Sequence, residues 1–541
     1  MTARCLTTTR LRRGALRGTL CGVLCSELFA ACARPTTRQT SPAPVGPHRP
    51  EPSAPLMQPV AEGAAPTLRA MLQRTADSIV AAPMWRNARL GLLIVDAESG
   101  DTLISHDADR LFMPASNQKL LTGAIALTVL GPEYRWRTPV LLHGVQRGRV
   151  WHGDVLVQGS GDPSVSDALR GGRAASAFDP VVRALAARGI RRIRGRVRAV
   201  GDALPGLTTG YGWAYDDFDA GYSAAIDELM FNEGELYLRV KAADRVGAPV
   251  RVERAPTRRY PALAVEALTR DSVLPVGSGR LPRLEASYDS IGHTLIVRGA
   301  LAVGDSARLT VAYRHPNDAF LAALTEALAD SGISVQSRAI ARRDTAGRAA
   351  DTVTVIESPR FAEVLARMEK PSQNQMAELF FRTAALHVTG SGSADSAQAL
   401  GARTLASWGI SGADAAYRDG SGLSRHDYVT PRAIIRVLDV MRRSPHFDLF
   451  RESLPIAGVD GTIRNRMRGT PAAGNVRAKT GTLDKARSLS GYVMTADGRL
   501  VMFSMLANNF TVPTRDVERV QDLLAAMVAG GTLNAAAGRT P

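Results

Sequence analysis

The chain has 541 residues, a formal net charge of +16 at pH 7, 45% hydrophobic residues and 22% charged residues. This length exceeds what one hydrophobic core usually serves, so we expect two or more domains with the composition of ordinary soluble globular protein. The positive charge would suit a polyanion such as nucleic acid or an acidic envelope polymer, but the arginines are spread along the chain, which favours a solvated basic surface.

The first 32 residues have the layout of an export signal, which also argues against a nucleic-acid partner. An arginine-rich start leads into the short apolar run "GTLCGVLCS" and then "ELFAACA". The end of this segment resembles a bacterial lipoprotein cleavage site with Cys32 as the lipidated residue, while "ACA" equally fits cleavage after Ala33. We therefore expect an exported protein of the periplasm or cell envelope, with Cys32 as its one candidate for a membrane anchor.

All four cysteines lie in this segment, so the mature chain is predicted to have no disulfide. Residues 33–65 are rich in Pro, Ser and Thr and lack a hydrophobic period, which predicts a flexible tether. No later stretch reaches ~18 uninterrupted apolar residues, so no further membrane span is expected.

Folded structure is predicted to begin with the helically spaced "TLRAMLQRTADSIV" at 67–80. Next, "LGLLIVDAESGDTLISH" at 90–106 predicts a β-hairpin. "SNQKLLTGAIALTVL" at 116–130 predicts a buried helix that follows Pro114 and carries Ser116 in its first turn.

From about 141 to 352 short β-like runs dominate, with a few helices such as "DAFLAALTEALADSG" at 318–332. Helices are predicted again from about 359 to 450, then a hairpin at 486–508 that turns at Asp497-Gly498, and a last helix from about 514. A β-rich block between segments of different character predicts an insertion. We expect a discontinuous domain of residues 66–140 and 353–541, with residues 141–352 forming one or two smaller domains.

Ser116 and Lys119 form the motif S-x-x-K. On a helix, positions i and i+3 share a face, and the positive helix N-terminus favours both a serine alkoxide and a deprotonated lysine. The chain has only five lysines against 62 arginines. Since burial can make a lysine neutral, and hence a base, while arginine stays charged, a lysine here predicts a nucleophile and base pair. A surface lysine on a helix is the structural alternative.

A second motif, "KPSQNQ", contains Lys370, Ser372 and Asn374 ahead of another helical run. The Ser372 hydroxyl is suited to relaying a proton, and the Asn374 amide to holding a substrate carbonyl and the catalytic lysine. The alternative is that Ser372 merely caps the helix.

The third motif is "AKTGTLDKA", with Lys479, Thr480, Gly481 and Thr482 on a predicted edge strand. Its cation and hydroxyl suit a substrate carboxylate, and Gly481 would let a peptide backbone approach closely. The backbone N–H of Thr482, with that of Ser116, is predicted to form an oxyanion hole for acyl transfer.

Three of the five lysines thus fall in S-x-x-K, K-P-S-x-N and K-T-G, in that order. These motifs resemble those of the active-site serine penicillin-recognising enzymes. The long insertion between the first two motifs is similar to the D-alanyl-D-alanine carboxypeptidase/endopeptidase family, peptidase family S13, of the penicillin-binding-protein-4 type. Other stretches that resemble this family are "GSGDPSVS" (159–166), "YGWAYDDFDAGYSA" (211–224), "DGSGLSR" (419–425) and "LPIAGVDGT" (454–462).

The resemblance implies an α/β (α+β) fold of the β-lactamase/transpeptidase-like type, an antiparallel sheet flanked by helices with a β-rich insertion. The implied roles are Ser116 as acylated nucleophile, Lys119 as its base, Ser372 and Asn374 as relay and positioning groups, and Lys479, Thr480, Gly481 and Thr482 as the carboxylate and oxyanion side. The resemblance also implies that Asp217 and Arg425 reach the diamino-acid end of a stem peptide, although Asp216 stands beside Asp217. The second motif reads S-Q-N where a further asparagine is frequent in the family, which bears on fine specificity.

The implied function is a serine D-Ala-D-Ala carboxypeptidase, and also a D,D-endopeptidase, that cleaves peptidoglycan stem peptides, is acylated by β-lactam antibiotics and needs no cofactor. A β-lactamase of the same motif group and a low-turnover cell-wall-binding scaffold are the alternatives. The chain has no G-x-S-x-G, no H-E-x-x-H and no zinc spacing in its mature part. Its histidines are scattered, and His426 is interpreted as a surface residue.

Overall fold

The computed structural model describes residues 67–271, 282–336, 340–344 and 350–533. The predicted export signal, the Cys32 anchor and the tether at 33–65 lie outside the described residues. Among the described helices, none is long and apolar enough to cross a membrane.

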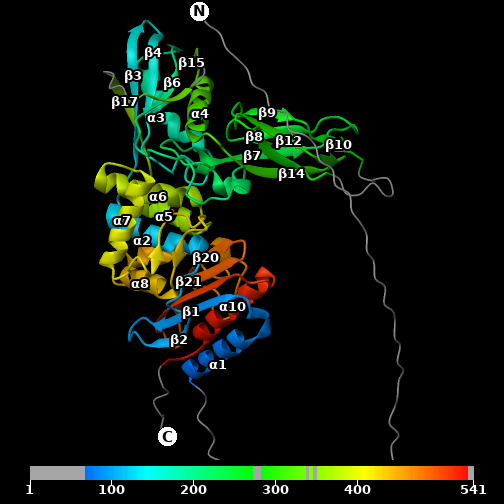
Figure 1. Cartoon of the computed structure of the whole chain (residues 1–541). Helices are drawn as coiled ribbons and strands as arrows, with labels where there is room; N and C mark the ends of the chain where they lie inside the picture. Colours follow the sequence, from blue (N-terminus) through cyan, green and yellow to red (C-terminus); the bar gives the residue numbers. More distant parts are fainter. Residues whose placement is uncertain (1–66, 272–281, 337–339, 345–349, 534–541) are drawn as a thin grey trace, which may run out of the picture. The chain divides into compact units, whose positions relative to one another are not determined.

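A five-stranded antiparallel sheet joins strands from the two ends of the described chain (Figure 1). In spatial order its strands are β2 (Thr102–His106), β1 (Arg89–Asp96), β22 (Leu500–Asn508), β21 (Ala486–Met494) and β20 (Arg477–Leu483). The strands β1, β21 and β22 are buried along almost their whole length. Such continuous apolar runs are expected where helices cover both faces of a sheet.

Helices α1 (Leu68–Ala81) and α10 (Thr514–Gly530) cover one face of this sheet (Figure 1). A helical layer covers the other, formed by α2 (Gln118–Leu130), α5 (Phe361–Glu369), α6 (Asn374–Thr389), α7 (Ala394–Ser407), α8 (Pro431–Arg442) and α9 (Phe447–Ser453). Helix α2 is buried on every side over its first ten residues, because it lies among these other helices. A lysine on this helix is therefore desolvated by the fold itself.

A second sheet is built from residues between α2 and α5. Its strand order is β15 (Ser334–Val335), β5 (Arg192–Arg194), β4 (Val150–Gln158), β3 (Arg137–Arg147) and β17 (Asp351–Glu357), with β6 (Val197–Val200) between β4 and β16 (Ile340–Asp344). Helices α3 (Asp179–Ala187) and α4 (Pro316–Asp330) pack on one face only, over a separate hydrophobic core.

Small sheets complete this middle part of the chain. They comprise β14 (Ser306–Ala312), β7 (Glu235–Lys241) and β8 (Arg251–Ala255); β11 (Glu285–Tyr288), β12 (Thr294–Arg298) and β9 (Ala262–Val265); and the pair β10 (Leu268–Arg270) and β13 (Ala300–Ala302). A further short pair, β18 (Ala415–Ala416) and β19 (Tyr428–Val429), lies within the helical layer's segment of the chain.

The structure confirms the predicted elements: the helix at 67–80 is α1, the hairpin at 90–106 is β1 and β2, and the closing hairpin and helix are β21, β22 and α10. The β-like runs and the helix at 318–332 are also present. The exact domain boundaries at residues 140 and 353 remain a prediction.

Candidate active site

Ser116 lies in a short 3-10 helix, Ala115–Asn117, that leads directly into α2. The expectation that Ser116 sits in the first α-helical turn is therefore wrong in detail. Ala115 has a φ of 48°, so the chain bends sharply after Pro114 and i to i+3 hydrogen bonds form before the α-helix begins. Lys119 follows in the first turn of α2, so the side chains of Ser116 and Lys119 still lie on the same side of the chain.

The Lys119 ammonium lies within hydrogen-bond distance of three oxygens. Its Nζ is 2.9 Å from Ser116 Oγ, 2.6 Å from Asn374 Oδ1 and 2.6 Å from the backbone oxygen of Ser421. The Lys119 side chain is fully buried. The structure thus brings together the first motif, the asparagine of the second motif and the loop "DGSGLSR" around one nitrogen.

Burial lowers the pKa of Lys119 to about 7. The nearby cation of Lys479 contributes to this lowering, whereas the carboxylates of Asp419, Glu369 and Glu378 act in the opposite direction. A substantial fraction of Lys119 is therefore neutral near pH 7, which the surface-lysine alternative does not allow.

The second motif is positioned by an unusual backbone. Ser372 has a φ of 67°, and its N–H donates to Glu369 O at 3.2 Å, so the chain turns sharply between α5 and α6. The suggestion that Ser372 caps the helix is wrong, because the Gln373 side chain accepts from Met376 N at 2.8 Å and performs that role. Within the described residues, the Ser372 hydroxyl forms no hydrogen bond with Ser116 or Lys119.

Asn374 faces Lys119 from the first residue of α6. Its Nδ2 donates to the backbone oxygen of Tyr222 at 2.7 Å, which fixes Oδ1 toward Lys119. Backbone from the middle part of the chain thus contacts the site directly, a feature that sequence reasoning did not anticipate.

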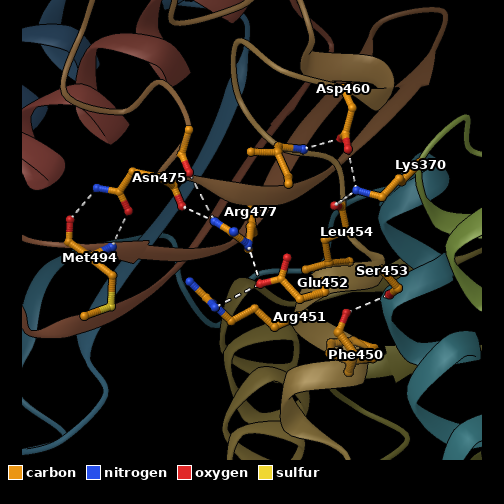
Figure 2. Close-up of polar contacts among 12 residues, drawn as sticks. Lys370, Phe450, Arg451, Glu452, Ser453, Leu454, Asp460, Asn475, Arg477 and Met494 are labelled. Atoms are coloured by element: carbon orange, nitrogen blue, oxygen red, sulfur yellow. Dashed lines mark hydrogen bonds and ion pairs between the residues drawn. The ribbon is translucent and has the colours of Figure 1, made fainter. Parts of the chain in front are cut away.

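Lys370 has a structural contact rather than one with Ser116. Its Nζ lies 2.6 Å from Asp460 Oδ2 and donates to Leu454 O at 3.1 Å, as Figure 2 shows. Asp460 also accepts from Ile456 N at 2.8 Å, so this ion pair organises the segment "LPIAGVDGT". The backbone oxygen of Lys370 accepts from Thr462 N at 3.1 Å.

The third motif lies on β20, which is the predicted edge strand. Lys479 is fully buried, burial lowers its pKa, and its backbone oxygen accepts from Asn117 Nδ2 at 2.8 Å. Thr480 Oγ1 donates to Thr462 Oγ1 at 2.7 Å, and Thr482 is exposed beside Arg487. The strand β20 therefore lies beside the Ser116 turn. It contributes one buried cation, Lys479, and two threonines, Thr480 and Thr482.

The space beside Gly481 is occupied by other parts of the protein, whereas the sequence predicted the close approach of a substrate backbone there. A Cβ at this position would lie 2.1 Å from Ser488 Oγ, 2.4 Å from Pro114 O and 3.0 Å from Ser116 N. The space beside Gly481 is thus filled by the turn that carries Ser116. This packing brings the strand of Thr482 next to the backbone N–H of Ser116, the two predicted oxyanion donors.

Sequence reasoning missed three buried carboxyl groups around the site. Glu378 accepts from Ser421 N at 2.9 Å, and Asp419 accepts from Gly422 N at 2.6 Å, so both hold the loop whose oxygen contacts Lys119. Both oxygens of Glu369 lack a hydrogen-bond partner among the described residues, and burial raises its pKa. Glu369 was detectable as a charged residue on the apolar stripe of its helix, together with positions 361, 364, 365 and 368.

The two predicted specificity residues lie on different loops. Asp217 Oδ1 accepts from the Tyr222 hydroxyl at 2.5 Å, so it is linked through Tyr222 to Asn374. Arg425 is exposed, and its Nη1 donates to Asp484 O at 3.4 Å at the end of β20. Asp216 is exposed, and the exposed His426 lies beside the Tyr211 ring in a tilted arrangement, at 5.2 Å between centroids.

Among the described residues, no group of three or more His, Cys, Asp or Glu side chains is arranged to hold a metal ion.

Comparison with known proteins gives matches along most of the chain. Residues 72–529 match the model of the "D-Ala-D-Ala carboxypeptidase 3 (S13) family". A D-alanyl-D-alanine carboxypeptidase of Actinomadura sp. (strain R39) is 30% identical over 474 residues, 85% of this chain and 84% of that protein. The D-alanyl-D-alanine carboxypeptidase DacB of Haemophilus influenzae is 25% identical over 450 residues, 80% of this chain and 87% of that protein.

Solved structures agree in fold. Penicillin binding protein 4 of Haemophilus influenzae has a TM-score of 0.71 at 22% identity, covering 83% of this chain and 98% of that chain. A structure of the same protein complexed with a β-lactam has a TM-score of 0.68 at 22% identity, covering 84% and 99%. The predicted mixed α+β fold with an antiparallel sheet flanked by helices is confirmed.

Proposed function

The chain belongs to the D-Ala-D-Ala carboxypeptidase 3 (S13) family. We propose that its three motifs together form the active site of a serine-type D-Ala-D-Ala carboxypeptidase. Ser116 is the nucleophile and Lys119 is the base that activates it. The substrates are peptidoglycan stem peptides that end in D-Ala-D-Ala.

The observation that carries this proposal is the environment of Lys119 Nζ. Asn374 Oδ1 and Ser421 O can only accept hydrogen bonds, and each lies 2.6 Å from Nζ. A neutral amine has two N–H groups, and these two oxygens take both. The lone pair of the neutral amine then points at Ser116 Oγ, 2.9 Å away, where it can accept the hydroxyl proton.

Acylation follows from this geometry. Ser116 Oγ forms a bond to the carbonyl carbon that precedes the terminal D-alanine, and its proton passes to Lys119 Nζ. The N–H groups of Ser116 and Thr482 stabilise the oxyanion. Collapse breaks the carbon–nitrogen bond, and the leaving amine takes the proton from Lys119 through Ser372. Water then hydrolyses the acyl-enzyme, with the proton again handled by Lys119 and Ser372.

Substrate contacts are assigned to the borders of the site. Lys479, Thr480 and Thr482 receive the terminal carboxylate, whose charge suits a buried cation and hydroxyl groups. Asp217, supported by Tyr222, and Arg425 contact the diamino acid of the stem peptide. The same site acts as a D,D-endopeptidase when the leaving amine belongs to the cross-linked chain instead of to a terminal D-alanine.

We place the protein in the periplasm or cell envelope, in agreement with the predicted export signal, with Cys32 as the candidate site of a covalent lipid anchor. β-Lactams are expected to mimic D-Ala-D-Ala and trap Ser116. A related protein of the family is known in complex with a β-lactam, which supports this expectation.

Intact-mass spectrometry before and after treatment with a penicillin tests the proposal, followed by peptide mapping of the adduct. We expect one stoichiometric adduct on Ser116, release of D-alanine from a D-Ala-D-Ala peptide, and loss of both in Ser116→Ala. The exposed Ser99 provides a matched control, because Ser99→Ala should retain both activities.

Absence of any adduct would contradict the proposed nucleophile and support the scaffold alternative. Rapid loss of the adduct, with release of hydrolysed penicillin and no D-alanine from peptides, would instead identify a β-lactamase.

A further inference from the structure

Arginines gather at one end of the second sheet, although they are spread along the sequence. The backbone oxygen of Arg149, in the turn between β3 and β4, accepts from Arg191 N at 2.8 Å and from Arg192 N at 3.2 Å. This contact brings the start of β5 against the β3–β4 turn. We call the following six residues the arginine face: Arg147, Arg149, Arg188, Arg191, Arg192 and Arg194.

Strand register places three of these side chains on the same side of the sheet. Val150 pairs with Arg147 on β3 and with Arg192 on β5, while His152 pairs with Arg194. Directly paired residues project to the same face of a sheet. The intervening Ile193 is fully buried under α3 and α4, so the arginines project from the opposite face, which these helices leave uncovered (Figure 1).

The arginine face has no internal counter-charge. All six residues are exposed, and none forms an ion pair with a carboxylate in the described part of the chain. Residues 140–200 contain eleven arginines and four aspartates. Of the nearby carboxylates, Asp154 is paired with Arg198 at 3.3 Å and Asp179 with Arg173 at 3.5 Å. Close like charges repel, so this arrangement costs folding stability until an external anion neutralises it.

We propose that the arginine face binds the anionic phospholipid headgroups of a membrane surface. Guanidinium groups bind phosphate in a bidentate manner and are weakly hydrated, so they suit headgroup phosphates. The surface is one side of an open sheet. On the same face Val145 is 55% exposed and pairs with His152, so an apolar side chain is available to enter the interface. The proposal involves no catalytic residue and is independent of the proposed reaction.

Vesicle sedimentation tests the proposal with the full chain carrying Cys32→Ser, so that no acyl chain contributes. We expect binding to phosphatidylcholine vesicles that contain about one-third phosphatidylglycerol, little binding to pure phosphatidylcholine, and loss of binding at high salt. A fourfold variant with Arg147→Gln, Arg149→Gln, Arg192→Gln and Arg194→Gln should bind at least ~100-fold more weakly.

The matched control removes the same number of charges from elsewhere. Its changes are Arg69→Gln, Arg74→Gln, Arg403→Gln and Arg515→Gln, at exposed arginines that form no ion pair in the described part of the chain. Penicillin acylation at the wild-type rate would show that both variants are folded. Equal weakening in the two variants would overturn the proposal, because net charge alone would then explain binding. Binding to soluble polyphosphate without binding to vesicles would overturn it as well.

Discussion

At the residue level, two buried lysines and three buried carboxyl groups share the space beneath Ser116. Lys119 and Lys479 come from α2 and β20, and Glu369, Glu378 and Asp419 come from α5, α6 and the loop that follows α7. Their charges act on one another through a poorly solvated interior, where electrostatic effects are strong. The proton affinity of Lys119 is therefore a property of the group of five.

Glu369 provides a specific test of this coupling. Its negative charge raises the pKa of Lys119, so Glu369→Gln should lower that pKa and move the rising limb of the acylation pH profile to lower pH. The measurement is the rate of acylation by a chromogenic β-lactam across pH. Glu363→Gln, on the exposed side of the same helix, should leave the profile in place. A rising limb that is unchanged, or that moves to higher pH, in Glu369→Gln would contradict the coupling.

Ser372 allows backbone geometry and chemistry to be separated. A left-handed backbone costs a non-glycine residue of the order of 1 kcal/mol, so Ser372→Gly should raise the free energy of unfolding by about 1 kcal/mol. The same change removes the relay hydroxyl and should slow acyl transfer by about 100-fold or more. Ser372→Ala should show the catalytic loss without the gain in stability. Full activity in either variant would remove Ser372 from the proposed relay.

At the element level, the site depends on how closely β20 packs against the 3-10 turn of Ser116. Gly481 is adjacent to Pro114 O, and the Ser488 hydroxyl donates to the same oxygen at 2.7 Å. This contact positions two backbone segments whose N–H groups would bind the oxyanion. The sequence motif K-T-G thus has a packing requirement in addition to its chemistry.

Gly481→Ala tests this requirement. The added Cβ would overlap Ser488 Oγ and Pro114 O and displace the strand, with an expected cost of about 1–3 kcal/mol in unfolding free energy. Acylation should fall by about 100-fold, because small displacements of reacting groups have large kinetic effects. Gly412→Ala is the matched control, since its Cβ would meet no atom within 4 Å. Thermal unfolding and acylation rates measure both effects, and normal acylation in Gly481→Ala would refute the packing argument.

At the scale of the whole molecule, much of the architecture was predictable because hydrophobic periodicity and turn residues are local signals. The order of the elements and the edge position of β20 follow from patterns in the sequence, whereas the convergence of Ser116, Lys119, Asn374 and Lys479 on one region was implied by the resemblance to the family. The contacts made by distant segments were not predictable. Nothing in the sequence indicates that the backbone of Tyr222 would orient Asn374, or that dispersed arginines would meet across β3, β4 and β5.

The central claim is that buried, neutral Lys119 is the base for Ser116, and the pH dependence of acylation tests it most directly. We predict that the acylation rate of the wild-type protein rises with pH with a midpoint of about 7, because the amine must lose its proton first. Lys119→Arg should not be acylated, since its guanidinium stays protonated. A rate that is constant between about pH 5 and 9, or appreciable acylation of Lys119→Arg, would contradict the account.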